Sequence, residues 1–214
     1  MVGRRSVHLG HPGVDPGASL MQWSTCPPAH GGLRRWLQAS GSLSARLAAT
    51  GQRFSVEVLD QGRRPLRADE ALALGASTQR IGYAREVLLR VDQRAMVYAR
   101  TVSQHADSIG AWRSLRGLGT RPLADVLFTR AGISREPLSY TRVRRGGRLQ
   151  QPVAKRWRAA TGQVLTQRAP AARRSIFTRR GRGLLVMEVF AAPASDWTWP
   201  GAALSLRELN RRLV

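Results

Sequence analysis

The stretch that decides the fold is Leu184-Leu185-Val186-Met187-Glu188-Val189-Phe190. Successive side chains of a strand point to opposite faces, and here both faces are apolar apart from Glu188. The run therefore predicts a strand that is covered on both sides. A lone carboxylate in such a strand loses its hydration, which is costly unless it is paired or protonated. Glu188 is therefore either the partner of a buried arginine or part of a functional site, and the residues alone leave both open.

Other short runs complete a predicted antiparallel sheet. Strand patterns occupy 54–59, 85–91, 96–102 and 136–143, and 175–178 forms a hairpin with the Glu188 strand through a turn at 180–183. Short helices are predicted at 33–37, 42–48, 112–118 and 120–128, and 63–79 is expected to be a loop with a helical turn near Glu70. The length of the chain favours a single domain that contains these strands and helices.

The composition favours an anionic ligand. The 214 residues include 35 basic and 13 acidic ones, which gives a net charge of +22. Such a field attracts nucleic acid, a membrane surface or a small polyanion. The basic runs lack the interleaved aromatics typical of nucleic-acid-binding proteins. The single cysteine, Cys26, excludes an internal disulfide and suits a reducing cytoplasm.

The ends and one internal stretch are expected to lie outside the compact domain, which we place at 23–196. Residues 1–22 lack the apolar core of a signal peptide and are predicted to be a disordered tail. Residues 144–166 are rich in Gly, Arg and Gln, which indicates an irregular surface insertion with at most a short helix around 153–160. Residues 197–214 form a predicted C-terminal extension with an amphipathic helix at 204–213. No run approaches the ~18 apolar residues of a membrane span.

Two further features accompany Glu188. Arg85 shares a strand face with Val87 and Leu89, and an arginine at the start of such a face can point into a cavity. Pro122 suits a first helical turn, which leaves the amide of Leu123 free to receive a carboxylate. The scattered histidines do not form a metal site, and the common phosphate-loop, dinucleotide and hydrolase motifs are absent. The remaining pattern suits a small anionic ligand with one polar group facing the acid.

Four pieces of the sequence resemble the bacterial chorismate lyases (chorismate pyruvate-lyases) of ubiquinone biosynthesis. They are 41–47, 85–89 together with 98–102, 118–128, and 173–175 together with 184–190. They occur in the family's order and span about 33–192. The resemblance implies an α+β fold, a six-stranded antiparallel sheet with flanking helices and with helical flaps over an internal ligand site. It also implies conversion of chorismate to 4-hydroxybenzoate and pyruvate, the first committed step of ubiquinone biosynthesis, with no cofactor or metal.

The resemblance also implies roles for four residues. Arg85 matches the arginine that binds the ring carboxylate, and Leu123 matches the residue whose backbone amide supports it. Leu43 falls at a flap position where the family often has methionine. Glu188 matches the acid that contacts the 4-oxygen end, which favours a functional interpretation of this acid over a neutralising ion pair. We therefore expect Arg85 and Glu188 to be catalytic.

The expected partners are chorismate and 4-hydroxybenzoate, in a cytoplasmic monomer without a stable nucleic-acid or membrane partner. One alternative is a non-catalytic effector domain, because one class of transcription regulators resembles the chorismate lyase fold. Those proteins carry an N-terminal DNA-binding domain, whereas only about 32 residues precede the first predicted helix here. The other alternative is a basic nucleic-acid-binding protein.

Overall fold

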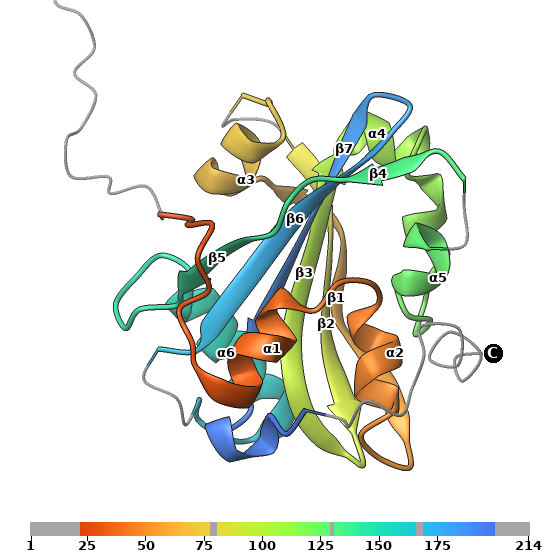
Figure 1. The fold of residues 1–214 in the computed structure, drawn as a ribbon. Coiled ribbons are helices and arrows are strands. Elements are labelled where there is room, and N and C mark those ends of the chain that lie inside the picture. Colours follow the sequence, from red (N-terminus) through yellow and green to blue (C-terminus); the bar gives the residue numbers. More distant parts are fainter. Residues whose placement is uncertain (1–21, 78–80, 129–130, 166–168, 200–214) are drawn as a thin grey trace, which may run out of the picture.

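The computed structural model describes residues 22–77, 81–128, 131–165 and 169–199. A single antiparallel sheet runs through it in the order β1-β2-β3-β7-β6-β4, and β5 also pairs with β6 (Figure 1). The strands are β1 (Phe54–Pro65), β2 (Ile81–Val91), β3 (Arg94–Gln104), β4 (Ile133–Arg135), β5 (Ser139–Arg142), β6 (Ala171–Arg179) and β7 (Arg182–Phe190). The α+β prediction is confirmed, but the sheet has seven strands because β4, with three residues, is too short to leave a sequence pattern.

Six α-helices and two 3₁₀ turns connect the strands of the described residues. The helices are α1 (Gly31–Gln38), α2 (Leu43–Ala48), α3 (Ala68–Ala73), α4 (His105–Ile109), α5 (Ala124–Leu127) and α6 (Gln150–Thr161). The segment predicted as a helix at 112–118 is only a 3₁₀ turn, Arg113–Leu115. Within the described ranges, no helix has both the length and the apolar character needed to cross a membrane. The predicted helix at 204–213 and nearly all of the predicted N-terminal tail lie outside the described residues.

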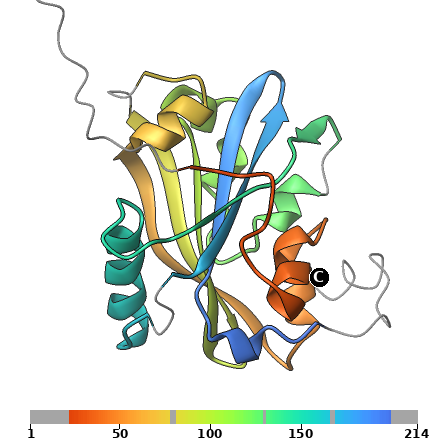
Figure 2. The same cartoon turned by 60° about the vertical axis from the view of Figure 1, so that its left-hand side comes forward.

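Both faces of the sheet are covered, as the apolar pattern of β7 predicts. On one face, which we call the flap face, Trp36 of α1 and Leu47 of α2 join the same core cluster as Val87 of β2. On the other face, which we call the α6 face, Trp157 packs in a cluster with Leu88 of β2. Figure 2 shows the sheet lying between α6 on one side and α1 and α2 on the other. Glu188, on β7, therefore stands in a strand with helices on both sides.

The segment 144–166, predicted to be an irregular surface insertion, contains α6, which packs on the sheet. The expected short helix is present and runs from Gln150 to Thr161, with Val153 and Trp157 buried against the sheet. Its left-handed C-cap, Gly162, ends the helix in the usual way. The segment appears irregular in sequence because its exposed side is Arg-, Lys- and Gln-rich and only one narrow stripe is apolar. α6 is thus part of the core.

Strand β1 is longer than predicted. The run Asp60-Gln61-Gly62-Arg63-Arg64 has the composition of a loop, yet it pairs with β2 through to Pro65 after a register shift between Val58 and Asp60. β1 is the edge of the sheet. An edge strand tolerates charged residues and a terminal proline because one side of its backbone is unpaired. The second half of this strand is polar and lacks the alternating apolar residues by which a strand is predicted.

A buried network of charges ties the α6 face together. Arg100 of β3 donates to Glu70 of α3 (Nε to Oε1, 2.6 Å) and to Glu86 of β2 (Nη1 to Oε1, 2.7 Å). Arg156 of α6 donates to the other oxygen of Glu86 (2.7 Å) and to Asp60 of β1 (2.6 Å). Each carboxylate is paired, which is what makes its burial tolerable. The network therefore holds α3 and α6 onto three neighbouring strands.

We expect Glu70→Gln to lower the free energy of unfolding by about 3–5 kcal/mol at neutral pH, because Arg100 then loses a buried partner. Burial alone would raise the pKa of Glu70, but the hydrogen bonds and charge of Arg100 outweigh it, so the pKa lies below its usual 4.5. The stabilisation by this carboxylate is therefore fully present above about pH 4.5 and is lost as the pH falls through the folded-state pKa. Urea unfolding at neutral and acidic pH measures both effects.

The matched control is Glu57→Gln, which removes a carboxylate whose side chain is 40% exposed beside Arg90. An exposed pair contributes about 0–1 kcal/mol, so this variant should unfold nearly as the parent does. Equal losses in the two variants would contradict the role given to the buried network.

Candidate active site

A small cavity lies on the flap face, between the flap helix α2, α5 and the β6–β7 hairpin. Its volume is about 40 Å³, which is room for only a few water molecules. The apolar part of its lining comes mainly from the flap and from α5, and the polar side chains are Ser44, Arg135, Arg173, Ser175 and Glu188. We call this space the flap-face cavity. A ligand the size of a six-membered ring can enter only if the cover moves.

Three of the four residues predicted for the site line this cavity: Leu43, Leu123 and Glu188. Leu43 is the first residue of α2 and is buried. The helix begins where Gly41, at φ +74°, turns the chain and the Ser42 hydroxyl accepts a hydrogen bond from the amide of Ala45 (3.0 Å). This cap fixes the flap helix with Leu43 toward the cavity. The fourth predicted residue, Arg85, is not among the lining residues.

Glu188 is paired, which corrects the expectation that it does not neutralise a buried charge. Its Oε2 accepts a hydrogen bond from Nε of Arg173, a side chain that is only 1% exposed. The two residues are directly opposite each other in the β6–β7 hairpin. The same carboxylate lines the flap-face cavity and its side chain is 16% exposed. The structural and the functional interpretations of this acid are therefore compatible.

Arg173 also reaches the end of α1. Its Nη1 donates to the carbonyl oxygens of Trp36, Leu37 and Ala39, each at 3.0 Å. The last carbonyls of a helix lack partners within the helix and carry partial negative charge, so a guanidinium is well suited to them. One buried side chain thereby links Glu188 to the segment that leads into the flap.

Arg85 lies on the same sheet face, farther from the hairpin. Its cross-strand partner is Thr101, which in turn pairs with Val186, two residues before Glu188 on β7. Arg85 is 2% exposed, and its Nη2 donates to the carbonyls of Gly119 (2.8 Å) and Arg121 (3.1 Å). Its Nε is buried without a hydrogen-bond partner among the described residues. Burial lowers the pKa of Arg85 to about 10, so the group stays cationic at neutral pH.

The chain that Arg85 holds leads directly into the cavity wall. Leu123 follows Arg121 and Pro122 and is the N-cap of α5. No backbone hydrogen bond given by the amide of Leu123 is found among the described residues, as expected for the first turn of a helix. The predicted pair, a buried guanidinium and a free amide, is thus present at one side of the site.

Arg135, Arg173 and Ser175 were not predicted for the site. Arg173 and Ser175 are on β6, on the same face as Glu188, and Arg135 is the last residue of β4. A two-residue turn at Arg180 and Gly181, both with positive φ, sets the hairpin register. That register alone would have placed Arg173 opposite Glu188, whereas the predicted four-residue turn puts Ser175 there.

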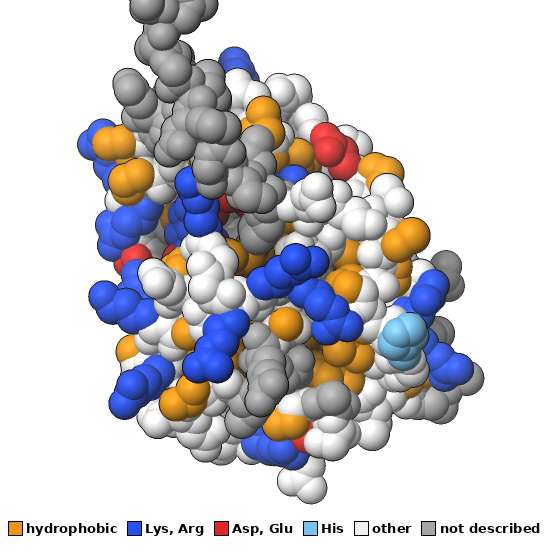
Figure 3. Space-filling view, turned by 90° about the vertical axis from the view of Figure 1, so that its left-hand side faces the viewer, with side chains coloured by type: hydrophobic (Ala, Val, Ile, Leu, Met, Phe, Trp, Pro, Cys, Tyr) orange, Lys and Arg blue, Asp and Glu red, His pale blue; other side chains and the backbone are white. Residues whose placement is uncertain are grey.

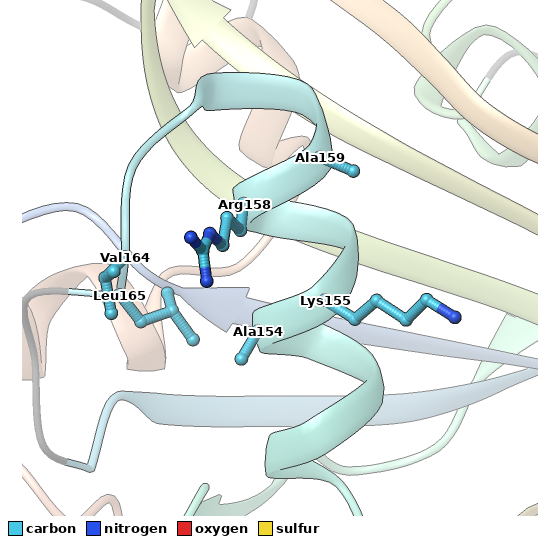
Figure 4. A pocket seen from close by; sticks show the side chains of 6 residues that line it. All are labelled: Ala154, Lys155, Arg158, Ala159, Val164 and Leu165. Atoms are coloured by element: carbon cyan, nitrogen blue, oxygen red, sulfur yellow. The ribbon is translucent and has the colours of Figure 1, made fainter.

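A larger hollow of about 480 Å³ lies on the outer side of α6 (Figure 4). It is lined by Ala154, Lys155, Arg158, Ala159, Val164 and Leu165. Figure 4 shows Lys155 pointing away from Leu165, so its ammonium does not converge on the hollow. The buried polar groups of the flap face are absent from this lining. We therefore place the candidate site in the smaller, covered cavity.

Fold and site together define a ligand-binding domain for a small organic anion, enclosed under helical flaps. The family model for chorismate lyase matches residues 24–198. A probable chorismate pyruvate-lyase of Albidiferax ferrireducens is 56% identical over 177 residues, which cover 83% of this chain and 90% of that protein. Another, from Ralstonia nicotianae, is 42% identical over 161 residues, covering 73% and 79% of the two chains. The chain belongs to the chorismate lyase family.

Solved structures show the same fold at much lower sequence identity. PhnF from Mycobacterium smegmatis aligns with a TM-score of 0.52 at 13% identity, over 72% of this chain and 65% of that one. At such identity the likeness shows a shared fold and nothing about activity.

We expect Arg173→Lys to lower the free energy of unfolding by about 1–3 kcal/mol, because an ammonium cannot reach Glu188 and the α1 carbonyls together. Hydrogen exchange should also become faster at the amides of residues 36–41, which Arg173 holds. The control is Arg179→Lys, in the same strand, whose Nη1 has one carbonyl partner, Ala111 (3.1 Å). If exchange near α1 were unchanged in the Arg173 variant, the proposed link would be wrong.

Proposed function

We propose that this protein converts chorismate to 4-hydroxybenzoate and pyruvate in the flap-face cavity. The observation that supports the proposal is that Glu188 and Arg85 lie on the same covered face of the sheet, two strands apart, in a chain of the chorismate lyase family. Arg85 and the amide of Leu123 bind the ring carboxylate, and Glu188 contacts the oxygen on C4. Leu43 covers the ring from the flap.

The distance between Arg85 and Glu188 suits a ligand with a single ring. On this shared face, Arg85 is two strands away from Glu188 across the sheet and two residues away along the strand direction. Their Cα atoms are therefore on the order of 12 Å apart. Both side chains leave the sheet on the flap face. A benzoate-like ring with a substituent at each end can span that interval with one charge-assisted hydrogen bond at either end.

The carboxylate end supplies orientation. The unpartnered Nε of Arg85 is a buried cationic donor, and such a group favours an anion strongly. The amide of Leu123 adds a second donor from the neighbouring helix start. Together they fix the direction in which the ring enters, which converts binding energy into alignment of the reacting atoms.

The other end carries the chemistry. The ether bond at C3 breaks, the ring loses the hydrogen on C4 as a proton, and the ring becomes aromatic while enolpyruvate becomes pyruvate. Aromatisation supplies the driving force, so the protein mainly has to position the substrate, exclude water and stabilise the departing ether oxygen. In this proposal Glu188 orients the C4 hydroxyl or accepts the proton.

The covered cavity and the positive surface fit this reaction. A flap that closes over a bound ring leaves little room for water beside it. Figure 3 shows Lys and Arg side chains spread over the face at the left of Figure 1. Such a field raises the local concentration of a dianionic substrate. The sequence relationships favour the lyase over a ligand-sensing effector domain. Cytoplasmic location and a monomeric state stay predictions.

We expect Glu188→Gln to lower kcat for chorismate by about a hundredfold or more, because the amide cannot accept a proton and orients the C4 hydroxyl less strongly. Chromatography of 4-hydroxybenzoate measures turnover. The matched control is Glu136→Gln, the same change in an exposed side chain next to Arg135, which should keep the parent's rate. Full turnover by the Glu188 variant at every pH would overturn the assignment, and no product from the parent protein would overturn the function.

We expect Arg85→Gln to weaken binding of 4-hydroxybenzoate by about tenfold to a hundredfold, the effect of losing a charge-assisted hydrogen bond. Calorimetric titration measures the Kd. Arg90→Gln, on the same strand but facing α6, is the control, because its partners are Glu57 and two backbone carbonyls away from the cavity. Unchanged affinity in the Arg85 variant would contradict its role as carboxylate anchor.

A further inference from the structure

Arg135 is a cationic side chain in the flap-face cavity without an acidic partner. Its Nε donates to the hydroxyl of Ser175 (3.2 Å), and its guanidinium carbon is 5.1 Å from the centre of the Phe177 ring. Among the described residues no carboxylate forms a salt bridge with it, and its two terminal nitrogens have no hydrogen-bond partner. Burial lowers the pKa of Arg135, while the charge of Glu188 acts in the opposite direction. A partly buried cation in this state has capacity for an anion.

The two other arginines of the site are already committed. Arg173 uses Nε on Glu188 and Nη1 on three backbone carbonyls. Arg85 lies at the end of the proposed site that binds the ring carboxylate, and it holds the loop before Leu123. Arg135 is close enough to Glu188 for their charges to interact. Of the cavity-lining cations that the structure describes, Arg135 is therefore the one at the Glu188 end that has no salt bridge with a carboxylate.

The substrate has a second carboxylate that needs such a group. Chorismate carries one carboxylate on the ring and another on the enolpyruvyl ether at C3, next to the C4 hydroxyl. If Glu188 faces the C4 oxygen, the C3 substituent is at the same end of the ring. We propose that Arg135 binds the carboxylate of the enolpyruvyl group and so distinguishes the substrate from the aromatic product. This inference rests on the proposed function.

During the reaction, the contacts of the enolpyruvyl carboxylate separate from the contacts of the ring. Cleavage of the bond between C3 and the ether oxygen leaves the electron pair on that oxygen. The enolate of pyruvate that forms takes a proton at its terminal carbon, and the ring gives up the C4 proton. The carboxylate on Arg135 then belongs to pyruvate, while 4-hydroxybenzoate keeps only its contacts with Arg85, Leu123 and Glu188. Arg135 therefore contributes to binding of the substrate and contributes nothing to binding of the aromatic product.

The test compares substrate and product in Arg135→Gln. We expect kcat/KM for chorismate to fall by about tenfold to a hundredfold, from loss of a charge-assisted hydrogen bond. The Kd for 4-hydroxybenzoate, from calorimetry, should stay within about twofold, which is within ordinary mutational scatter. Arg142→Gln is the matched control, because it removes one positive charge from the exposed side of β5. This control measures how much the overall positive charge of the protein contributes to binding of a dianion. We expect kcat/KM for chorismate and the Kd for 4-hydroxybenzoate to stay near the parent's values.

The outcomes separate the possible failures. A parallel rise in the Kd for 4-hydroxybenzoate, or an unchanged kcat/KM, would show that Arg135 does not bind the enolpyruvyl carboxylate. Thermal unfolding shows whether Arg135→Gln folds. If it does not, Arg135→Lys keeps the charge without the planar fork and should lower kcat/KM for chorismate by a smaller factor, with the same Kd for 4-hydroxybenzoate. Absence of product from the parent protein in the same assay would refute the proposed function instead.

Discussion

The rest of the site depends on the buried guanidinium of Arg173. It is fixed by the hairpin on one side and by the carbonyl end of α1 on the other. Burying an arginine is costly unless it is paired and hydrogen-bonded, and here Nε and Nη1 meet one carboxylate and three carbonyls. Removing any of these partners leaves a charge or a carbonyl unpaired in the core. The acid of the cavity and the entry to the flap are consequently held in one arrangement by one side chain.

The two faces of the sheet use charge differently. On the α6 face, each carboxylate of the Arg100 network has a close cationic partner, and the helices above it are held in place. On the flap face the cations exceed the acids: Glu188 stands with Arg135 and Arg173 in the cavity, and Arg85 is nearby. A balanced network stabilises a fold, whereas an unbalanced one has capacity for a ligand of opposite charge. The sheet thus separates a structural cluster from a binding one.

The sequence was sufficient for features that depend on strong local patterns. The apolar run around Glu188 predicted a strand covered on both faces, and the resemblance identified Leu43 and Leu123, which both line the cavity. Arg85 was placed on the correct face by alternation, but its use of two loop carbonyls depends on tertiary contacts that no local pattern encodes. Arg173 was missed because the turn was judged two residues too long. Arg135 was missed because three residues are too few to show a strand.

The polar second half of β1 also affects how this edge of the sheet meets other chains. The outer backbone of an edge strand can pair with any exposed strand of another chain. Here that stretch carries Arg63 and Arg64 and ends in Pro65, which has no N–H to donate. Charge repulsion and the missing donor oppose growth of the sheet by a second copy. The polar residues of this strand thereby protect a chain with a large antiparallel sheet against edge-to-edge aggregation.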